Sequence, residues 1–336
     1  MAASSASVEH RVVGESEAGQ RIDNYLLRIL KGVPRSRVYR LLRRGEVRVD
    51  GKRSRPTHRL EAGETVRIPP VRSSGGAGEA PSVSQGLGRL LESRILYEDD
   101  QLLVVNKPSG YAVHGGSTVR IGVIEAFKQL RSSSGLIELV HRLDRETSGC
   151  LLVAKRRSAL RALHTQLRDG SVEKTYRALL CGEMPEEERR IDAPLQRNRE
   201  HLGERLVHVS GEGQRAITHF RVLARYPGFT EVAARIETGR THQIRAHARH
   251  IGLPIAGDTR YGDEPARAST RSLGLGRLFL HADRLSFRHP RSGDPLTVEC
   301  APDPELSEHL EALRSMTGKP PRTPCTEHSP DHVEED

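Results

Sequence analysis

The sequence LIELVHRLDRETSGCLLVAK, residues 136–155, places two apolar runs on either side of a short charged segment. Both runs have the composition of buried strands, and the Thr-Ser-Gly run at 147–149 favours a turn. Asp144, between Arg142 and Arg145, is therefore expected in a connection between two strands. Connections often carry functional side chains because a rigid scaffold holds them at the surface. Taken alone, the same charges also fit an ordinary surface turn with weak ion pairs.

Strand-like runs recur on both sides of this stretch, from about Leu90 to Arg314. Examples are QLLVVNK, TYRALLC, FTEVAARIE and PLTVEC, and shorter helical segments such as SALRALHTQLRDG lie between them. Strand and helix do not alternate regularly, as they would around a parallel sheet. The pattern predicts an α+β domain over residues 89–315.

A smaller domain is predicted over residues 19–72. Apolar residues at helical spacing run from Ile22 to about Lys31, and a second helix with an arginine-rich outer face ends at Gly45. Two alternating segments follow, and Asp50-Gly51 between them suits a tight hairpin turn. This order of elements predicts a helix-helix-hairpin module.

Three segments lack apolar periodicity and are expected to be unstructured. Residues 1–18 are small and polar and are predicted to be a disordered N-terminus. Residues 73–88 combine Gly, Ser and Pro, which is typical of a flexible linker. Residues 316–336 are rich in Pro and end in acidic residues, so they are predicted to form a disordered tail.

The chain is basic, with 53 Lys and Arg against 44 Asp and Glu, a formal net charge of +9 and a pI near 9.7. Such a molecule attracts polyanions, nucleic acid above all, although a basic surface without a specific partner gives the same totals. The positive charge is concentrated in the small domain, where the predicted RNA-binding patch comprises Arg35, Arg37, Arg40, Arg43, Arg44, Arg48 and Lys52.

Composition also indicates the cellular compartment of the protein. The four cysteines are scattered without metal-site or disulfide-framework spacing, as expected of free thiols in a reducing environment. The first residues lack the pattern of a secretory leader, and no run is apolar enough to span a bilayer. We therefore expect a cytoplasmic protein without a membrane partner.

Several chemistries lack their usual motifs. The chain has no phosphate-binding GxxxxGK[ST] loop, no dinucleotide fingerprint and no GxSxG elbow, so we expect no nucleotide cofactor. His242, His247 and His250 fall at unequal angles around their helix, and no cysteine or carboxylate stands at a diagnostic zinc spacing. We expect no metal, and packing or RNA contact for these histidines.

Three further segments carry candidate residues. The segment around GRTHQIRAHARHIG predicts a helix capped by Thr241, with Ile244 facing inward. Tyr176 lies in an alternating strand, where an ordinary core aromatic is the usual outcome. Lys107 and His114 lie on either side of a glycine-bearing turn. Each of these signals is weak by itself.

Taken together and in order, NKPSGYAVHGG, HRLDRETSG, KTYRALLCG and TGRTHQIRAHARHIGLPIAGD resemble the ribosomal large-subunit class of RNA pseudouridine synthases, over about residues 19–315. Two glycines follow His114, as in subgroup C of that class, whereas subgroup D has a proline there. The small module resembles the RNA-binding domain first known from protein four of the small ribosomal subunit.

The resemblance implies a central mixed, largely antiparallel sheet with a cleft. It also implies that Asp144 is the catalytic aspartate, that Tyr176 packs against the target base, and that Arg245 pairs with the aspartate. Arg142 matches an arginine that helps extrude the uridine. Four other residues of the same motifs are expected to bind substrate: His141, Ile244, Lys107 and His114.

The implied reaction breaks the bond between nitrogen and ribose in uridine and rejoins the ring through carbon 5, which requires neither cofactor nor metal. An ionised carboxylate can attack the ribose, add to the base or remove a ribose proton, and these paths remain open. The target base must first leave its stack, which costs about a few kcal/mol. Stacking on an aromatic side chain and filling of the gap by an arginine would offset that cost.

The expected partner is large-subunit ribosomal RNA or an assembly intermediate, and the expected state is a monomer. Two alternatives remain open at this point. The same chemistry could act on subgroup D sites or on transfer RNA. A protein of another class, a non-catalytic RNA-binding or ribosome-assembly factor, could keep the fold and use it only to bind RNA.

Overall fold

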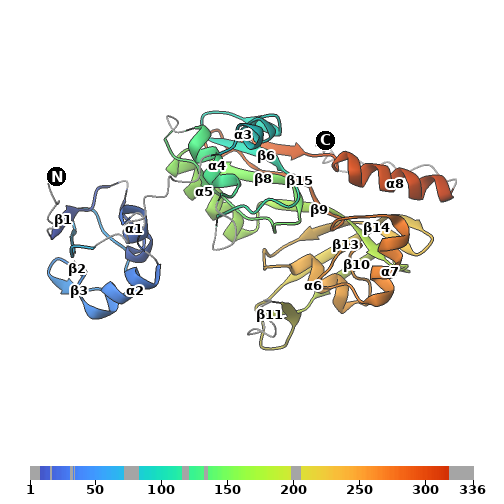
Figure 1. The fold of residues 1–336 in the computed structure, drawn as a ribbon, viewed down its shortest axis with the longest axis horizontal. Coiled ribbons are helices and arrows are strands. Elements are labelled where there is room, and N and C mark those ends of the chain that lie inside the picture. The colour runs from blue at the N-terminus through green and yellow to red at the C-terminus, as the bar shows by residue number, and fades with distance from the viewer. Residues whose placement is uncertain are drawn as a thin grey trace, which may run out of the picture. The chain divides into compact units, whose positions relative to one another are not determined.

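The computed structural model describes residues 8–15, 17–30, 33, 35–71, 83–115, 121–131, 135–197 and 206–317. Its contacts divide the chain into two compact units, residues 1–80 and 81–336 (Figure 1). Each unit has a hydrophobic core of its own. The described helices and strands make this an α+β protein, as the sequence predicts.

The smaller unit contains the expected helix-helix-hairpin order. Its elements are β1 (Glu9–Val12), α1 (Ile22–Ile29), α2 (Arg35–Arg44), β2 (Arg48–Val49), β3 (Lys52–Arg53) and β4 (Thr65–Ile68). Asp50 and Gly51 form the turn between β2 and β3, both at positive φ, as the Asp-Gly pair predicts. Apolar residues of α1 and α2 pack into one core with those of β4.

The prediction of a disordered N-terminus is wrong for part of residues 1–18. Strand β1 pairs antiparallel with β4, so the sheet has the order β1-β4-β2-β3. All four residues of β1 are exposed, and an edge strand with no buried face shows no apolar alternation. Pairing with a strand more than fifty positions away stabilises it, which sequence periodicity does not reveal. Residues 1–7 lie outside the described part.

The larger unit is built on one extended sheet. The strands of this unit are β5 (Ile95–Glu98), β6 (Leu102–Lys107), β7 (Glu138–Leu139), β8 (Ser148–Ala154), β9 (Glu173–Cys181), β10 (Glu188–Asp192), β11 (Leu195–Arg197), β12 (Val207–Val209), β13 (Ile217–Tyr226), β14 (Phe229–Ile236), β15 (Leu280–Arg288) and β16 (Pro295–Glu299). Strands β11 and β12 pair only with each other, in a separate two-stranded sheet. The main order is β10-β13-β14-β9-β15-β8-β6-β5, with β16 on β15 and β7 on β8. Among the strands that the structure describes, only β15 and β8 pair in parallel, so the sheet is mixed and largely antiparallel, as expected.

Helices pack against this sheet and complete the core. They are α3 (Gln85–Glu92), α4 (Val123–Leu130), α5 (Arg157–Asp169), α6 (Gln243–His250), α7 (Glu264–Leu273) and α8 (Pro304–Thr317). Helix α5 contacts β8, α6 contacts β12 and β13, α7 contacts β9, and α8 contacts β13. Figure 1 shows α4 and α5 towards one end of the unit, and α6 and α7 towards the other.

The linker and tail predictions require correction at their borders. The predicted linker 73–88 overlaps α3, which begins after Ser84; the Ser84 hydroxyl accepts a hydrogen bond from the amide of Leu87. Packing of α3 on α4 outweighs its glycine content, and Gly88 allows Leu130 of α4 to approach closely. The predicted tail begins at residue 316, but α8 continues to Thr317. Residues 72–82 and 318–336 lie outside the described part.

The connection between β7 and β8, which carries Asp144, is held by hydrogen bonds near both of its ends. Lys107, fully buried, donates hydrogen bonds to the carbonyls of Pro108, Tyr111 and Arg145 at 2.9, 2.9 and 3.0 Å. Ser148, the first residue of β8, lies 2.8 Å from His281 Nδ1 of β15. The connection that carries Asp144 is therefore held in a fixed place.

Gly149 allows β8 and β15 to approach one another. Its φ is +106°, and an added Cβ would lie 2.3 Å from the carbonyl oxygen of Ala282. A side chain there would separate the strands, because L residues rarely adopt that φ and the oxygen belongs to the backbone. The parallel pairing spans only Ser148 with His281 and Gly149 with Ala282.

Candidate active site

A cavity of about 70 Å³ lies where the connection before β8 meets the segment that leads into α6. Three parts of the fold line it. The connection contributes Arg142, Leu143, Asp144 and Thr147; the sheet contributes Tyr176, Ile236 and Leu280; and the remaining lining residues are Gly239, Arg240, Thr241, His242, Gln243, Ile244 and Arg245. Segments far apart in the chain thus converge on one carboxylate.

Asp144 has a partly accessible carboxylate in the lining of this cavity. Its side chain is 19% exposed, and the neighbouring Leu143 is buried. The nearest cationic candidate is His242, whose Nε2 lies 3.9 Å from Asp144 Oδ2. A carboxylate placed this way can reach a bound molecule without first breaking an internal hydrogen bond to His242.

Tyr176 and Ile244 form the apolar wall of the cavity. Both are buried, Tyr176 on β9 and Ile244 on α6. Burial, followed by the charge of Asp144, raises the pKa of Tyr176, so the phenol stays neutral. A neutral aromatic face beside a carboxylate suits a flat, uncharged ring such as a nucleobase.

Arg245 lines the cavity but forms its ion pair with Asp258 and not with Asp144. Its Nε and Nη2 each donate to a carboxylate oxygen of Asp258 at 2.7 Å, and both side chains are buried. Glu146 lies 3.5 Å away, whereas no ion pair within 4.0 Å joins Arg245 to Asp144 in the described structure. The expected direct pair with Asp144 is therefore wrong in its partner, although Asp144 is close enough to favour the charged guanidinium.

His242 has an unusual backbone and a defined environment. Its φ is +52°, in the left-handed region that non-glycine residues seldom adopt, and it precedes α6. The predicted cap by Thr241 is thus wrong, because His242 holds the cap position and no side chain caps the helix. His242 Nδ1 lies 3.0 Å from the hydroxyl of Tyr261, and their rings meet edge to face.

The hydrogen-bond pattern favours one arrangement of protons for this pair. The Tyr261 hydroxyl accepts from the amide of Val207 at 2.9 Å, so its own hydrogen is available to His242 Nδ1. A neutral imidazole that accepts at Nδ1 carries its proton on Nε2, the atom facing Asp144. Burial lowers the pKa of His242, as do Arg245 and Arg260, while Asp144 and Asp258 oppose them.

Three residues expected to bind substrate do not line the cavity. His141 Nε2 accepts a hydrogen bond from the amide of Leu152, and burial lowers its pKa to about 4. Lys107 binds the three carbonyls described above; burial lowers its pKa to about 7, but three acceptors match the three protons of the charged amine. His114 lies 3.9 Å from Glu125, on the segment before α4.

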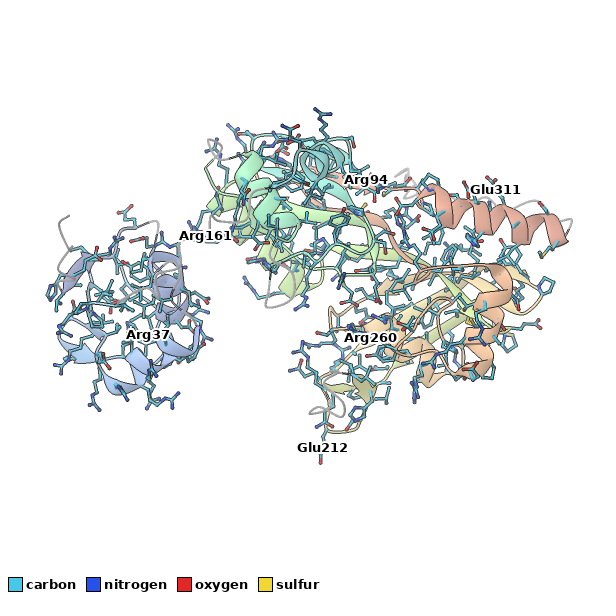
Figure 2. The ribbon with its side chains drawn as sticks, in the orientation of Figure 1. Arg37, Arg94, Arg161, Glu212, Arg260 and Glu311 are labelled. Atoms are coloured by element: carbon cyan, nitrogen blue, oxygen red, sulfur yellow. The ribbon has the colours of Figure 1, made fainter. Side chains whose placement is uncertain are left out.

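The arginine patch of the smaller unit is accessible where its side chains are described. Arg40, Arg43 and Arg44 on α2 are exposed, as are Arg48 and Lys52 on the hairpin. Arg37, which Figure 2 labels, is half-buried. The side chain of Arg35 lies outside the described part. Arg44 has one acidic neighbour, Glu46, at 3.9 Å. The exposed charge is thus mostly free to meet a polyanion.

The sequence did not single out Asp258, Tyr261 or Arg240. Asp258 and Tyr261 lie in GDTRYG, which reads as an ordinary polar loop, and no periodicity marks them. The one available signal was the requirement that a buried arginine have a carboxylate partner. Among the described residues, no group of three or more His, Cys, Asp or Glu side chains is arranged to hold a metal ion. No described helix is long and apolar enough to cross a membrane.

Comparison with known proteins places this geometry in a family. Residues 101–250 match the RNA pseudouridylate synthase family, and residues 20–66 match the S4 domain. The larger unit resembles human RNA pseudouridylate synthase domain containing 4, with a TM-score of 0.57 and 26% identity over 68% of this chain and 96% of that one. Human RNA pseudouridylate synthase domain containing 1 has a TM-score of 0.53 and 25% identity over the same shares of the two chains.

The chain belongs to the RNA pseudouridine synthases, the family that its motifs indicated. It is 51% identical over 312 residues to ribosomal large subunit pseudouridine synthase C of Pasteurella multocida (strain Pm70), covering 92% of this chain and 95% of the relative. The protein of that name from Escherichia coli (strain K12) is 50% identical over 311 residues, 92% of this chain and 98% of its own. The predicted resemblance to subgroup C is thereby confirmed.

Proposed function

We propose that this protein isomerises uridine to pseudouridine in large-subunit ribosomal RNA, with Asp144 as the catalytic carboxylate. The observation that carries the proposal is an accessible carboxylate opposite a buried tyrosine in a cavity rimmed by arginine. The names of the relatives supply the RNA class. Such a substrate would place the enzyme in the cytoplasm, and the monomeric state stays a prediction.

The proposed roles follow from position. Asp144 would react with the uridine, by whichever of the three paths the sequence leaves open. Tyr176 would stack on or beside the flipped base, because its ring is the aromatic surface that lines the cavity. Arg245 is held by Asp258 and would act on Asp144 through its field and not through a direct ion pair.

Arg142 has the freedom that an extruding side chain needs. It is exposed at the rim, and no hydrogen bond or ion pair ties it to any residue of the described structure. The cavity of about 70 Å³ is smaller than the roughly 300–1,000 Å³ typical of ligand pockets. A bound uridine would therefore project from the cavity past the rim, where the exposed Arg142 is suitably placed to enter the gap that the uridine leaves in the RNA.

The proposal is tested by tritium release from large-subunit ribosomal RNA that carries tritium at carbon 5 of uridine. Rejoining the ring through that carbon expels its hydrogen, so an active enzyme releases tritium in proportion to the sites modified. Bulk transfer RNA and small-subunit ribosomal RNA serve as comparison substrates. Release from large-subunit RNA alone is expected; release from none of the three would contradict the proposed reaction, and binding without release would favour the RNA-binding alternative.

The arginine patch should increase the affinity for RNA without taking part in the reaction. Replacing Arg40, Arg43 and Arg44 together by glutamine is expected to weaken RNA binding and to reduce the slope of log K against log salt by up to about 2, at roughly 0.7 per phosphate contact with a single strand. The measurement is a titration of RNA at several salt concentrations. Lysine at all three positions keeps the charge and should retain most of the slope, whereas an unchanged slope in the glutamine variant would refute this role.

Tyr261 should influence the reaction through His242. Replacing Tyr261 by phenylalanine removes the hydroxyl that fixes the proton of His242 on Nε2. We expect kcat to fall roughly 3- to 10-fold with little change in KM, the size of one ordinary hydrogen bond. Activity is measured well below the unfolding temperature, because the amide of Val207 also loses its acceptor. Equal kcat values for the variant and the wild type would show that His242 needs no such orientation.

A further inference from the structure

A second hollow, of about 520 Å³, opens directly beside the catalytic cavity. The two share Arg142, Gly239, Arg240 and Thr241, so a molecule in one is adjacent to a molecule in the other. We call this second hollow the hairpin groove, because β11 and β12 form its far wall. None of the proposed roles above uses it.

The wall of the hairpin groove is well ordered by backbone contacts. Leu195 exchanges two hydrogen bonds of 2.9 Å with Gln214, which holds the turn at Glu212–Gln214 against β11. Gly213 allows this contact, because an added Cβ would lie 2.6 Å from the backbone of Leu195. The side chains of Gln196 and Gln214 therefore start from fixed backbone positions.

The same wall is joined to the catalytic cavity through a small core. Leu195 and Val207 of the hairpin pack with Ala216, Ala246 of α6 and Tyr261. The amide of Val207 also donates to the Tyr261 hydroxyl, which contacts His242. The wall of the groove and the His242 side of the catalytic cavity are thus parts of one packed cluster.

The chemistry of the groove suits a nucleotide. Arg142, Arg197 and Arg240 supply positive charge, and Arg240 is held by a hydrogen bond of 3.1 Å from its Nε to the carbonyl of Arg215. The side-chain amides of Gln196 and Gln214 form no hydrogen bond with any residue of the described structure. Among the described residues that line the groove, Glu212 is the acidic one, and Figure 2 shows its side chain directed away from the unit.

We propose that the hairpin groove binds a nucleotide next to the target uridine in the same RNA strand, with its arginines on the phosphates and Gln196 and Gln214 on the edge of the base. This inference rests on the proposed function. Phosphate contacts position a strand, whereas amide groups hydrogen-bond to the donors and acceptors on base edges. The groove would therefore give the enzyme a preference for the neighbouring base.

The geometry favours a neighbouring nucleotide over a distant one. When a uridine is flipped into the catalytic cavity, its own phosphates must pass the shared rim of Arg142 and Arg240. The next nucleotide then lies within one backbone step of the groove. The volume of the hairpin groove, about 520 Å³, falls within the roughly 300–1,000 Å³ range of small-ligand pockets.

The experiment measures binding, so that it does not depend on turnover. The Asp144→Asn protein is titrated with short RNA oligonucleotides that hold one uridine between every combination of neighbouring bases, and with oligonucleotides that lack the base on the 5′ or the 3′ side. The same titration is repeated after Gln196→Ala and Gln214→Ala are added together. Arg221→Ala serves as the control, because Arg221 is exposed on β13 and lines neither hollow.

Removal of the base on one side is expected to weaken binding about 5- to 20-fold in the Asp144→Asn protein, the equivalent of one or two hydrogen bonds. The protein that also carries Gln196→Ala and Gln214→Ala should show that weaker binding already with intact RNA, and no further loss with the abasic RNA. The inference is overturned if both proteins respond equally to loss of the base, or if neither responds. Absence of tritium release by the wild type would instead contradict the proposed function, and the binding pattern would still decide the role of the groove.

Discussion

Replacing Asp144 by asparagine is expected to abolish tritium release while RNA binding is retained. The substitution keeps the size of the side chain but removes the charge and most of its nucleophilicity, so the rate should fall by at least about a thousandfold. RNA affinity should change little, because Asp144 is a small part of the contact surface and an uncharged side chain repels phosphate less. The measurement pairs tritium release with an RNA titration on the same preparation.

The matched control is Asp294→Asn, the same chemical change at an exposed aspartate of the turn between β15 and β16. It should leave both release and binding at wild-type values. Retention of a tenth or more of the activity by the Asp144 variant would show that another group performs the reaction. Loss of RNA binding together with activity would point to misfolding, which a thermal unfolding curve detects.

Replacing Asp258 by alanine is expected to destabilise the larger unit by about 3–5 kcal/mol, because it leaves the buried charge of Arg245 without its partner. Asp258 also accepts hydrogen bonds from the amides of Arg260 and Tyr261 at 3.0 Å each, so the loop before α7 would loosen as well. For a domain of this size each kcal/mol lowers Tm by roughly 2–4 °C. The measurement is thermal or urea unfolding of the whole chain.

A second variant separates the unpaired charge from other damage. Adding Arg245→Met to Asp258→Ala removes the uncompensated charge, and stability should return in large part, although not activity, since Arg245 lines the cavity. Glu264→Gln breaks an exposed ion pair with Arg271, both side chains being more than half exposed, and should leave the stability almost unchanged. If Asp258→Ala were as mild as Glu264→Gln, the buried pair would have no structural importance.

The features predicted from sequence are those with local signals. The hairpin turn at Asp50-Gly51 and the connection around Asp144 each follow from a few consecutive residues. Strand β1 was missed because its stability comes from distant β4. Helix α3 was missed because its two glycines and the serine-rich segment before it conceal an apolar face that packs on α4. In both cases tertiary contacts, which local composition does not report, decide the structure.

The residues of the candidate site were predicted better than the contacts between them. The convergence of Asp144, Tyr176 and Ile244 could be expected from motifs that resemble a family, and the structure brings them to one cavity. The partner of Arg245 was wrong because Asp258 lies thirteen positions further on, beyond the end of α6, in a loop without periodicity. Partnerships between buried charges depend on how loops fold back, and spacing alone does not determine them.

The position of Asp144 relative to Tyr176 depends on the short parallel pairing between β8 and β15. Asp144 belongs to the block of β5, β6 and β8, whereas Tyr176 and the segment before α6 belong to the block that begins at β15. The blocks meet along a seam of two residue pairs, fastened by Ser148, which bonds to His281 and accepts from Arg277 at 2.7 Å. Under the proposed roles, the stiffness of that seam would determine how accurately the carboxylate of Asp144 and the flipped base are aligned, so residues that never touch RNA would influence the rate.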